Sequence, residues 1–330
     1  MATIRDIAEH LGISISTVSK GLNGGTDISE ELRSRILDTA VEMGYQTKQS
    51  KKTGNRKLAV FIENMAYEKP SDFGYDIVLG FRQTAAREKW NVEIIPSAPE
   101  KEKIEKYDAY LLKNGFSGAF LVGFAMDDPW LEQLKTTRMP TVLLDNEIPY
   151  NSFVCEVGTD SREGIGLAVD HLRKLGHTKI AFLNGSQGSR VTYDRQEAFE
   201  RNMKRVGLLA DEKLMAYGYF VPEAASYHVR GFLEHGATAI LCASDLIAEG
   251  VIAECARMGY RVPEDVSVIG YDDIALAAAL DPPLTTVRQE RKLLGSQAYM
   301  SLYSLIHGIP VGKTLLRPAL ILRQSCGAVR

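Results

Sequence analysis

Hydrophobic residues recur every three to four positions in the first 45 residues, a spacing typical of short amphipathic helices. Thr3 can cap a first helix, which Gly12 ends, and Ser14 can cap a second one only a few residues later. Ser29 begins a third helix, which Gly44 closes. The inward-facing apolar positions are Ile4, Ile7, Ala8, Leu11, Val18, Leu22, Leu32, Ile36, Leu37, Ala40 and Met43. Two helices separated by a three-residue turn and followed by a third predict a small all-α helix-turn-helix unit.

From Leu58 onward, short β-rich runs alternate with helical patterns. The runs are LAVFI, VEII, GAFLVG, TVLLD, VCEVGT, KIAFLNG, ATAILCA and VSVIGYD. Such alternation predicts parallel sheets covered by helices, and seven or eight repeats are too many for one ordinary open sheet. We therefore expect an α/β domain of two similar lobes. The predicted division is 1–45 for the helical unit, 46–57 for a linker, and 58–330 for the two-lobed domain, with lobe N at about 58–159 plus 290–320 and lobe C at about 160–289 plus 321–330.

Polar residues follow the strand-like runs, where open α/β sheets bind their ligands. They are Asp145, Asp160, Ser244, Asp245, Asp272 and Asp273, with Arg195 opening a helix after KIAFLNG and Phe73, Tyr219 and Phe220 supplying flat apolar faces. Carboxylates and an arginine can hydrogen-bond vicinal hydroxyls while a ring covers the C–H face of a sugar. Taken singly, these residues are more typical of helix caps, loop ties and core positions than of a ligand site. Their common placement favours a site for a hydroxylated ligand between the lobes.

Composition narrows the class of protein. Hydrophobic residues make up 45% of the 330 and charged residues 25%, as in ordinary globular chains. The longest apolar runs fall far short of the roughly 18 residues that a membrane span needs. No secretory signal pattern precedes the first helix, so we expect a cytoplasmic protein. The four cysteines are scattered along the chain: Cys155, Cys242, Cys255 and Cys326. We expect them to be reduced thiols rather than disulfides or metal ligands.

Charge is divided unevenly along the chain. The first 57 residues carry nine basic and seven acidic side chains, a net charge of +2. The net charge of the whole chain is −3, so the remaining residues carry −5. Five basic residues and no acid lie between Lys48 and Lys57. Such a run is typical of a tail that contacts phosphates, although a solvated linker would have the same composition.

Side chains at the exposed start of the second helix suit DNA. Ile15, Ser16, Thr17 and Lys20 are short or flexible enough to let that helix enter a major groove. The segments TIRDIAEHLGISISTVSKGLN and ISEELRSRILDTAVEMGY resemble the headpiece of the LacI family of bacterial transcription regulators. The resemblance implies that the second helix reads bases through Ile15, Ser16 and Lys20. It also implies phosphate or groove-edge contacts from Thr3, Ser14, Thr17, Ser19 and Asn23.

The rest of the chain resembles the effector domain of the same family, which is built like periplasmic sugar-binding proteins of type I. The matching segments are VGTDSREGIGLAVDHLRKLGHTKIAFLNG, YDRQEAF, ILCASDLIAEGV and VPEDVSVIGYDDIALAAALDPPLTTVRQERKLLG. The resemblance implies effector contacts from Phe73, Asp160, Arg195, Phe220, Ser244 and Asp272. Three positions depart from the family pattern: Ser244-Asp245 replaces Asn-Asp, Ala198 replaces a glycine, and Arg291 lies where an aromatic or apolar residue is common.

The linker departs most from this family. Relatives continue after the tyrosine matching Tyr45 with a proline and a short helix whose leucine wedges into the minor groove. This chain has QTKQSKKTGNRK there, without proline, leucine or another apolar wedge. We therefore expect an extended basic segment that contacts phosphates without kinking DNA strongly. The expected contacts are Lys48, Lys51, Lys52 and Arg56.

Together these observations predict a homodimeric, sequence-specific DNA-binding regulator, a repressor, whose operator affinity a small effector controls. We expect a carbohydrate effector, no cofactor, no metal, no membrane partner and no catalytic activity. The sequence leaves open a corepressor, such as a purine-like ligand, in place of an inducer. It also leaves a sugar- or nucleoside-processing enzyme as an alternative, although Val169 breaks the dinucleotide fingerprint that GIGLAV begins. A secreted sugar-binding protein would lack the helical unit.

Overall fold

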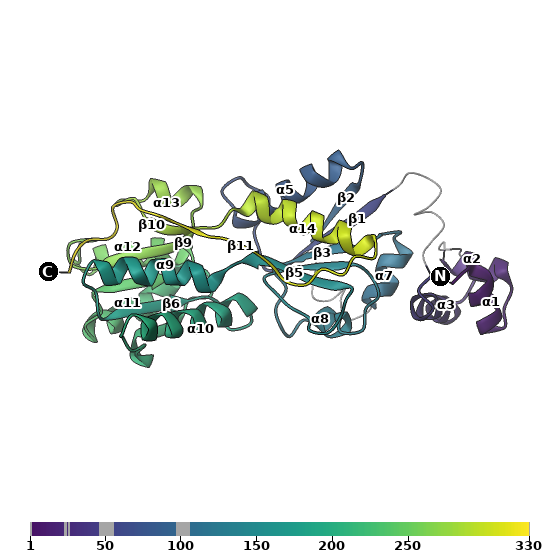
Figure 1. Cartoon of the computed structure of the whole chain (residues 1–330), viewed down its shortest axis with the longest axis horizontal. Coiled ribbons are helices and arrows are strands. Elements are labelled where there is room, and N and C mark those ends of the chain that lie inside the picture. Colours follow the sequence, from purple (N-terminus) through teal and green to yellow (C-terminus); the bar gives the residue numbers. More distant parts are fainter. Residues whose placement is uncertain (1, 23–24, 26, 46–55, 97–105, 330) are drawn as a thin grey trace. The chain divides into compact units, whose positions relative to one another are not determined.

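The computed structural model describes residues 2–22, 25, 27–45, 56–96 and 106–329. These residues form a three-helix segment and two six-stranded sheets with helices packed around them (Figure 1). The chain divides into two compact units. Unit 1 contains Met1–Met65, Val78–Val157 and Gly295–Thr314, and unit 2 contains Ala66–Ile77, Gly158–Leu294 and Leu315–Arg330.

The predicted helix-turn-helix unit is confirmed. Its helices are α1 (Ile4–Leu11), α2 (Ile15–Leu22) and α3 (Glu30–Glu42). Thr3 and Asp6 form a reciprocal capping box at the start of α1, and Gly12 ends α1 in the left-handed conformation that glycine adopts most readily. Ser29 caps α3 by accepting a hydrogen bond from the amide of Leu32. The three helices enclose a small core of buried apolar side chains: Ile7, Ala8, Val18, Leu22, Ile36, Leu37, Ala40 and Tyr45.

Unit 1 is built on a sheet with the strand order β11-β5-β4-β3-β1-β2. The pairs β1 with β2, β1 with β3, β3 with β4 and β4 with β5 are all parallel. The central strands are buried along their whole length, which requires cover on both faces of the sheet. The strands are β1 (Lys57–Ile62), β2 (Asn91–Pro96), β3 (Ala119–Val122), β4 (Thr141–Leu144), β5 (Val154–Thr159) and β11 (Thr314–Leu316). The helices are α7 (Tyr107–Lys113), α8 (Pro129–Leu134) and most of α5 (Phe73–Arg87) and α14 (Arg291–Ile306), whose first residues belong to unit 2.

Unit 2 repeats this architecture with the order β12-β10-β9-β8-β6-β7. All its pairs are parallel except that between β10 and β12. Helices α9 and α10 pack together, as do α11 and α12. The strands are β6 (Ile180–Asn184), β7 (Met215–Tyr217), β8 (Ala239–Cys242), β9 (Ser267–Asp272), β10 (Thr285–Arg288) and β12 (Ala319–Ile321), and the helices are α9 (Ser161–Lys174), α10 (Arg190–Arg205), α11 (Ala225–Glu234), α12 (Asp245–Arg257) and α13 (Ala275–Ala279), with 3-10 turns at Glu212–Leu214 and Pro222–Ala224.

Three details of the predicted organisation were wrong. Strand β1 takes up Lys57, which the prediction placed in the linker, because Lys57 pairs in register with Asn91. Residues 66–77, predicted for lobe N, belong to unit 2. Of residues 290–320, which the prediction assigned to lobe N, only Gly295–Thr314 belong to unit 1. Strand β12 lies in the sheet of unit 2. The sequence prediction also missed β7, β10, β11 and β12.

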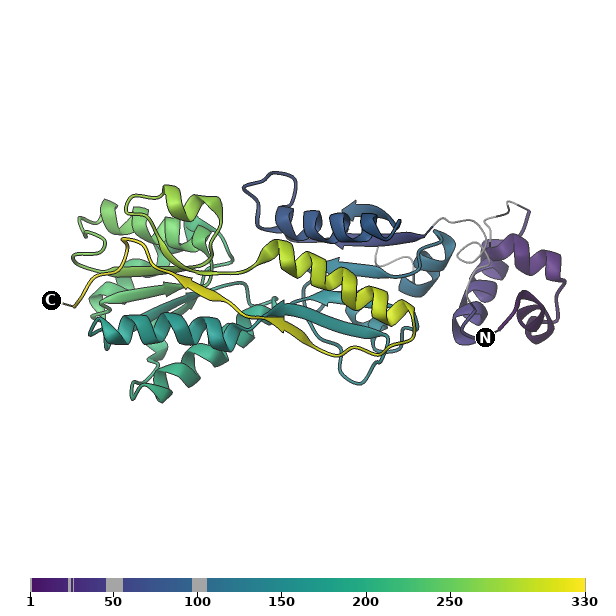
Figure 2. The same ribbon diagram turned by 45° about the horizontal axis from the view of Figure 1, so that its top comes forward.

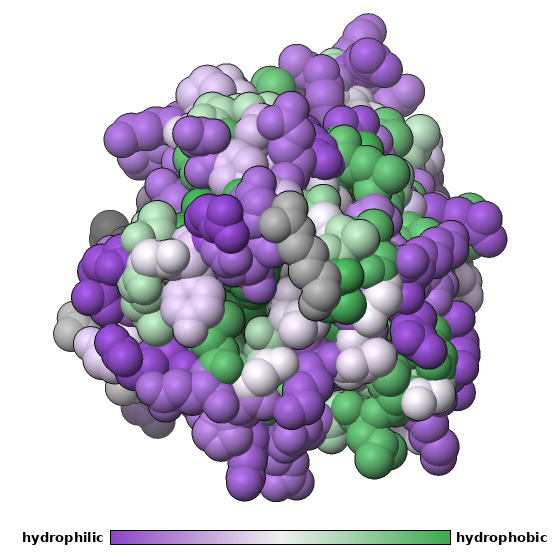
Figure 3. All heavy atoms as spheres, turned by 90° about the vertical axis from the view of Figure 1, so that its left-hand side faces the viewer, coloured by the Kyte–Doolittle hydropathy of each residue, from purple (hydrophilic) through white to green (hydrophobic). Residues whose placement is uncertain are grey.

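Seen from the side on which the carboxyl terminus lies, the surface is largely hydrophilic, with hydrophobic side chains in small separate groups (Figure 3). Among the described residues, no helix is both long and apolar enough to cross a bilayer. The four cysteines are free thiols, as expected, and three of them are buried.

Candidate DNA interface and effector site

The start of α2 presents the side chains that the sequence analysis assigned to base reading. Ser14 caps this helix, because its Oγ accepts a hydrogen bond from the Thr17 amide at 3.1 Å. Ile15 remains 48% exposed and Ser16 is exposed, whereas Val18, Gly21 and Leu22 are buried. The helix therefore anchors one face in the core and leaves short side chains free on the other, as groove insertion requires.

Close packing against α3 fixes the position of α2. Gly21 lies on the buried face of α2, and a Cβ atom added there would come within 2.6 Å of Ile36 Cδ1. Only a residue without a side chain allows the two helices to approach so closely. The sequence analysis did not single out Gly21, although a glycine inside a short helix is a signal for such contact.

Lys20 forms an ion pair with Asp27, a residue that the sequence analysis also missed. Both side chains are about half exposed. The Lys20 hydrogen bond lowers the pKa of Asp27, so this carboxylate stays ionised at neutral pH. A DNA phosphate or base that binds Lys20 therefore competes with an acidic partner already present on the protein.

Some of the other predicted DNA contacts lie outside the described residues, and the rest can be placed in the structure. Asn23, Lys48, Lys51 and Lys52 lie outside the described residues. Thr3 is engaged by the capping box, and Asp6 has a lowered pKa because of hydrogen bonds from the Thr3 backbone and side chain. Arg56 lies over the Trp90 ring, 5.5 Å from its centroid, and its Nη1 approaches the Glu88 carbonyl oxygen at 3.4 Å. Ser19 is half-buried on α2.

In unit 2, Arg195 and Asp272 lie at the carboxyl end of β9. Arg195 is only 3% exposed, with its guanidinium 3.9 Å from the centroid of the Tyr271 ring, and it donates to the Ala243 carbonyl oxygen. Its Nε is buried without a hydrogen-bond partner. The expectation that Arg195 opens its helix was wrong, because α10 begins at Arg190 and places Arg195 in the second turn.

Asp272 is 8% exposed and accepts a hydrogen bond from Gln289 Nε2 at 2.7 Å. Burial raises the pKa of Asp272 to about 6, while Arg195, the Gln289 hydrogen bond and Arg291 act in the opposite direction. Its backbone φ of 111° is rare for a residue other than glycine, and Asp273 has a positive φ of 52°. Strained backbone of this kind costs about 1–3 kcal/mol and is concentrated at functional sites. Gln289 has no signal in the local sequence, because its partner is on another strand.

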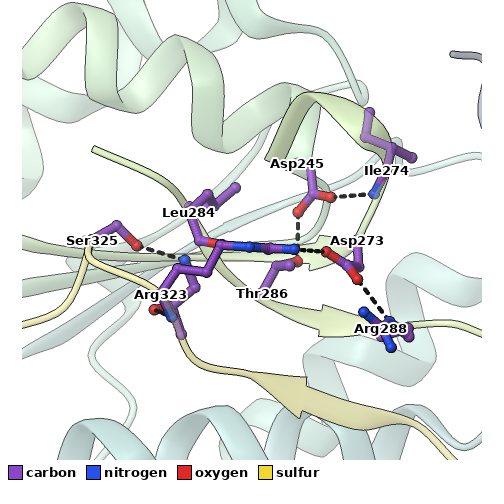
Figure 4. Close-up of polar contacts among 9 residues, drawn as sticks. Asp245, Asp273, Ile274, Leu284, Thr286, Arg288, Arg323 and Ser325 are labelled. Carbon is purple, nitrogen blue, oxygen red and sulfur yellow. Dashed lines mark hydrogen bonds and ion pairs between the residues drawn. The ribbon is translucent and has the colours of Figure 1, made fainter. Parts of the chain in front are cut away.

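Asp245 and Asp273 are structural rather than available to a ligand (Figure 4). Asp245 is fully buried, and its carboxylate accepts hydrogen bonds from the Thr286 hydroxyl at 2.5 Å and the Ile274 amide at 2.8 Å. Burial raises the pKa of Asp245 well above its usual value, with a further contribution from the charge of Asp272. Asp273 lies between two arginines, Arg288 at 2.7 Å and Arg323 at 2.6 Å. These contacts join the ends of β9 and β10 to α12 and the C-terminal segment.

Ser244 and Asp160 both serve as helix N-caps. The Ser244 hydroxyl accepts from the Ile247 amide at 3.2 Å, and Asp160 Oδ1 accepts from the Glu163 amide at 3.0 Å. Ser244 directly follows Ala243, whose carbonyl oxygen holds Arg195, so it belongs to the same end of the sheet. A cap uses one lone pair of the side-chain oxygen and leaves the other available.

The two predicted rings are placed differently. Phe220 has a positive φ of 57°, and its ring lies against Gly185, where an added Cβ would approach Phe220 Cζ to 2.0 Å. Phe73 begins α5, and the Arg291 guanidinium lies 5.9 Å from its ring centroid. Arg291 also forms an ion pair with Asp76 at 3.1 Å, which explains how a charge is tolerated at a position that the sequence comparison expects to be apolar.

The chain matches two family models. Residues 3–48 match the bacterial regulatory proteins of the lacI family, and residues 169–326 match the periplasmic binding protein-like domain. Among curated proteins, the HTH-type transcriptional repressor CytR of Escherichia coli (strain K12) is 28% identical over 337 residues, which cover 99% of this chain and 97% of that protein.

Solved structures agree. The complex of the transcriptional regulator CelR with cellobiose has a TM-score of 0.73 at 26% identity, covering 98% of this chain and all of the other. The lac repressor dimer bound to operator and the anti-inducer ONPF has a TM-score of 0.71 at 25% identity and 99% coverage of both chains. The chain therefore combines a lacI-family helix-turn-helix headpiece with a periplasmic-binding-protein-like domain, and it is similar over nearly its whole length to regulators of that family.

Proposed function

We propose that this protein is a cytoplasmic transcriptional repressor without enzymatic activity, which binds a near-palindromic operator as a homodimer and changes its affinity when a small effector binds unit 2. One short recognition helix covers only a few base pairs, and two-fold pairing doubles the contacts. Ile15, Ser16 and Lys20 read bases, and the basic segment around Lys51 contacts phosphates. The remaining assigned phosphate and groove-edge contacts are Thr3, Ser14, Thr17, Ser19, Asn23, Lys48, Lys52 and Arg56.

The observation that carries the effector site is the buried pair Arg195 and Asp272 at the end of β9. A buried guanidinium with a free Nε, beside a carboxylate, offers both a donor and an acceptor to adjacent hydroxyl groups. Phe73, Phe220, Ser244 and Asp160 complete the proposed site. We propose a carbohydrate effector, with a purine-like corepressor as the second candidate.

Calorimetry with a panel of sugars, nucleosides and purine bases tests this assignment. Hydrogen bonds to charged groups contribute about 1.5–3 kcal/mol each, so Arg195→Ala should weaken binding of the active compound about tenfold to a hundredfold. Operator binding without effector should stay at the wild-type level in this variant. Wild-type effector affinity in Arg195→Ala would refute the site, and turnover of a sugar or nucleoside by the pure protein would favour an enzyme.

A further inference from the structure

A pocket of about 470 Å³ opens at the edge of the unit 1 sheet, and none of its lining residues is among those assigned to DNA or effector. Its walls come from the connection between β4 and β5, from β5 itself, and from the segment between α14 and β11. Figure 2 shows the chain after α14, in yellow, leading into β11, which is the neighbour of β5 in the sheet. Apolar lining residues include Ile148, Pro149, Val154, Pro310 and Val311.

Glu156 brings a buried carboxylate to this pocket. It lies in the middle of β5 and its side chain is 5% exposed. Its Oε1 accepts from Lys313 Nζ at 2.8 Å, but its Oε2 is buried without any hydrogen-bond partner. Buried polar atoms almost always have a partner, so an unpaired carboxylate oxygen on a residue that lines a pocket indicates a missing donor.

The electrostatics favour a cation as that donor. Burial raises the pKa of Glu156 to about 7; Lys313 opposes this shift, whereas Asp145 and Glu147 add to it. The charges of Asp145 and Glu147 thus make the surroundings of Glu156 more negative. Lys313, the ion-pair partner of Glu156, is 40% exposed. A metal ion is a poorer match, because within the described part of the chain no three His, Cys, Asp or Glu side chains gather closely enough to hold one.

We propose that this pocket, here called the Glu156 pocket, binds a small organic cation. Its amidinium or ammonium group donates to Glu156 Oε2, and its hydrocarbon part packs on Ile148, Pro149 and Val311. The pocket lies wholly within unit 1, so the repressor has a second small-molecule site that does not depend on the Arg195–Asp272 assignment.

Benzamidine is the test probe, and benzamide, its neutral counterpart of the same shape, is the ligand control. Binding to the full-length protein is measured by calorimetry at pH 8.5, where Glu156 is ionised and the amidinium keeps its charge. We expect saturable benzamidine binding and none by benzamide. Glu156→Gln should weaken benzamidine binding at least tenfold, the loss expected when a charge-assisted hydrogen bond is removed. Binding should also weaken as the pH falls through about 7, where Glu156 takes up a proton.

Two variants separate a ligand site from a merely structural ion pair. Glu254→Gln is the matched control, because Glu254 is likewise buried, at 7% exposure, and paired with Arg257, but it lies on α12. It should bind benzamidine like the wild type. Lys313→Met removes the ammonium group that competes for Glu156, so it should tighten benzamidine binding. This variant still tests the site if Glu156→Gln fails to fold. No saturable binding up to 10 mM, equal affinity for benzamide, or a loss of binding in Lys313→Met would overturn the proposal.

Discussion

Alanine at position 21 should loosen the recognition helix without touching any DNA-contacting side chain. Gly21 faces Ile36 across the contact between α2 and α3, and a Cβ atom would lie 2.6 Å from Ile36 Cδ1 and 3.0 Å from its Cγ2. Ile36 is fully buried, so it cannot swing toward solvent. The two helices must move apart, or Ile36 must leave its preferred rotamer.

The expected cost follows from two opposing effects. Overpacking a core typically destabilises by about 1–3 kcal/mol. Alanine in place of glycine favours a helix by about 1 kcal/mol. The net loss is therefore about 1 kcal/mol, which corresponds to roughly a fivefold larger population of the open headpiece. Because α2 carries the base-reading residues, operator affinity should fall as well.

Hydrogen exchange of residues 4–22 in the full-length protein, together with operator binding by fluorescence anisotropy, measures both effects. Gly231→Ala is the matched control: Gly231 lies inside α11 with nothing within 4 Å of an added Cβ, so this change should slow local exchange. Ile36→Val removes Cδ1 and should restore part of the protection in the Gly21→Ala background. Wild-type exchange and wild-type operator affinity in Gly21→Ala would refute the packing argument.

Three further changes test other parts of the structure. Asp272 has a pKa of about 6 in the folded protein against an ordinary value of 3.8, so the stability of the wild type should fall as the pH rises between these values. In urea unfolding, the stability of Asp272→Asn relative to the wild type should rise by up to about 3 kcal/mol over that pH range. A stability difference that does not change with pH would contradict the raised pKa. Asp27→Asn removes the ion-pair partner of Lys20 and should strengthen binding to random DNA. The slope of log K against log salt concentration should become steeper by about one per subunit. An unchanged slope would show that the ion pair does not restrain Lys20. Thr286→Val removes a donor to buried Asp245 and should cost about 1–3 kcal/mol in thermal or urea unfolding, whereas a neutral effect would mean that Asp245 finds another partner.

Local signals made much of this fold predictable. The cap at Thr3 and the stop at Gly12 depend on residues within one helical turn, so the sequence alone places α1 correctly. The central strands are continuous apolar runs, and such runs stand out in any parallel sheet buried on both faces. Strand β10 was missed because Thr285–Arg288 is short and polar at its ends, although its β-branched residues are typical of a strand.

The details of the candidate site depend on contacts between distant segments. Gln289 meets Asp272 only because β10 pairs with β9 in parallel register. Asp245 looks like a ligand-binding carboxylate in the sequence, yet its oxygens are taken up by Ile274 and Thr286. No periodicity or local motif reports such partners, so they become visible only when the sheet is assembled.

Effector binding in unit 2 is proposed to control the affinity of the headpiece for DNA. An operator selected from random duplexes allows the most direct measurement: the Kd for operator with and without the active effector, and the Kd for effector with and without operator. Thermodynamic linkage requires the same factor in both directions, and regulatory coupling of about 1–3 kcal/mol corresponds to roughly 5- to 150-fold. We predict equal factors in this range for the wild type. In Arg195→Ala, an effector concentration that just saturates the wild type should change operator affinity much less. An operator affinity that no bound effector changes would show that the two sites are not coupled.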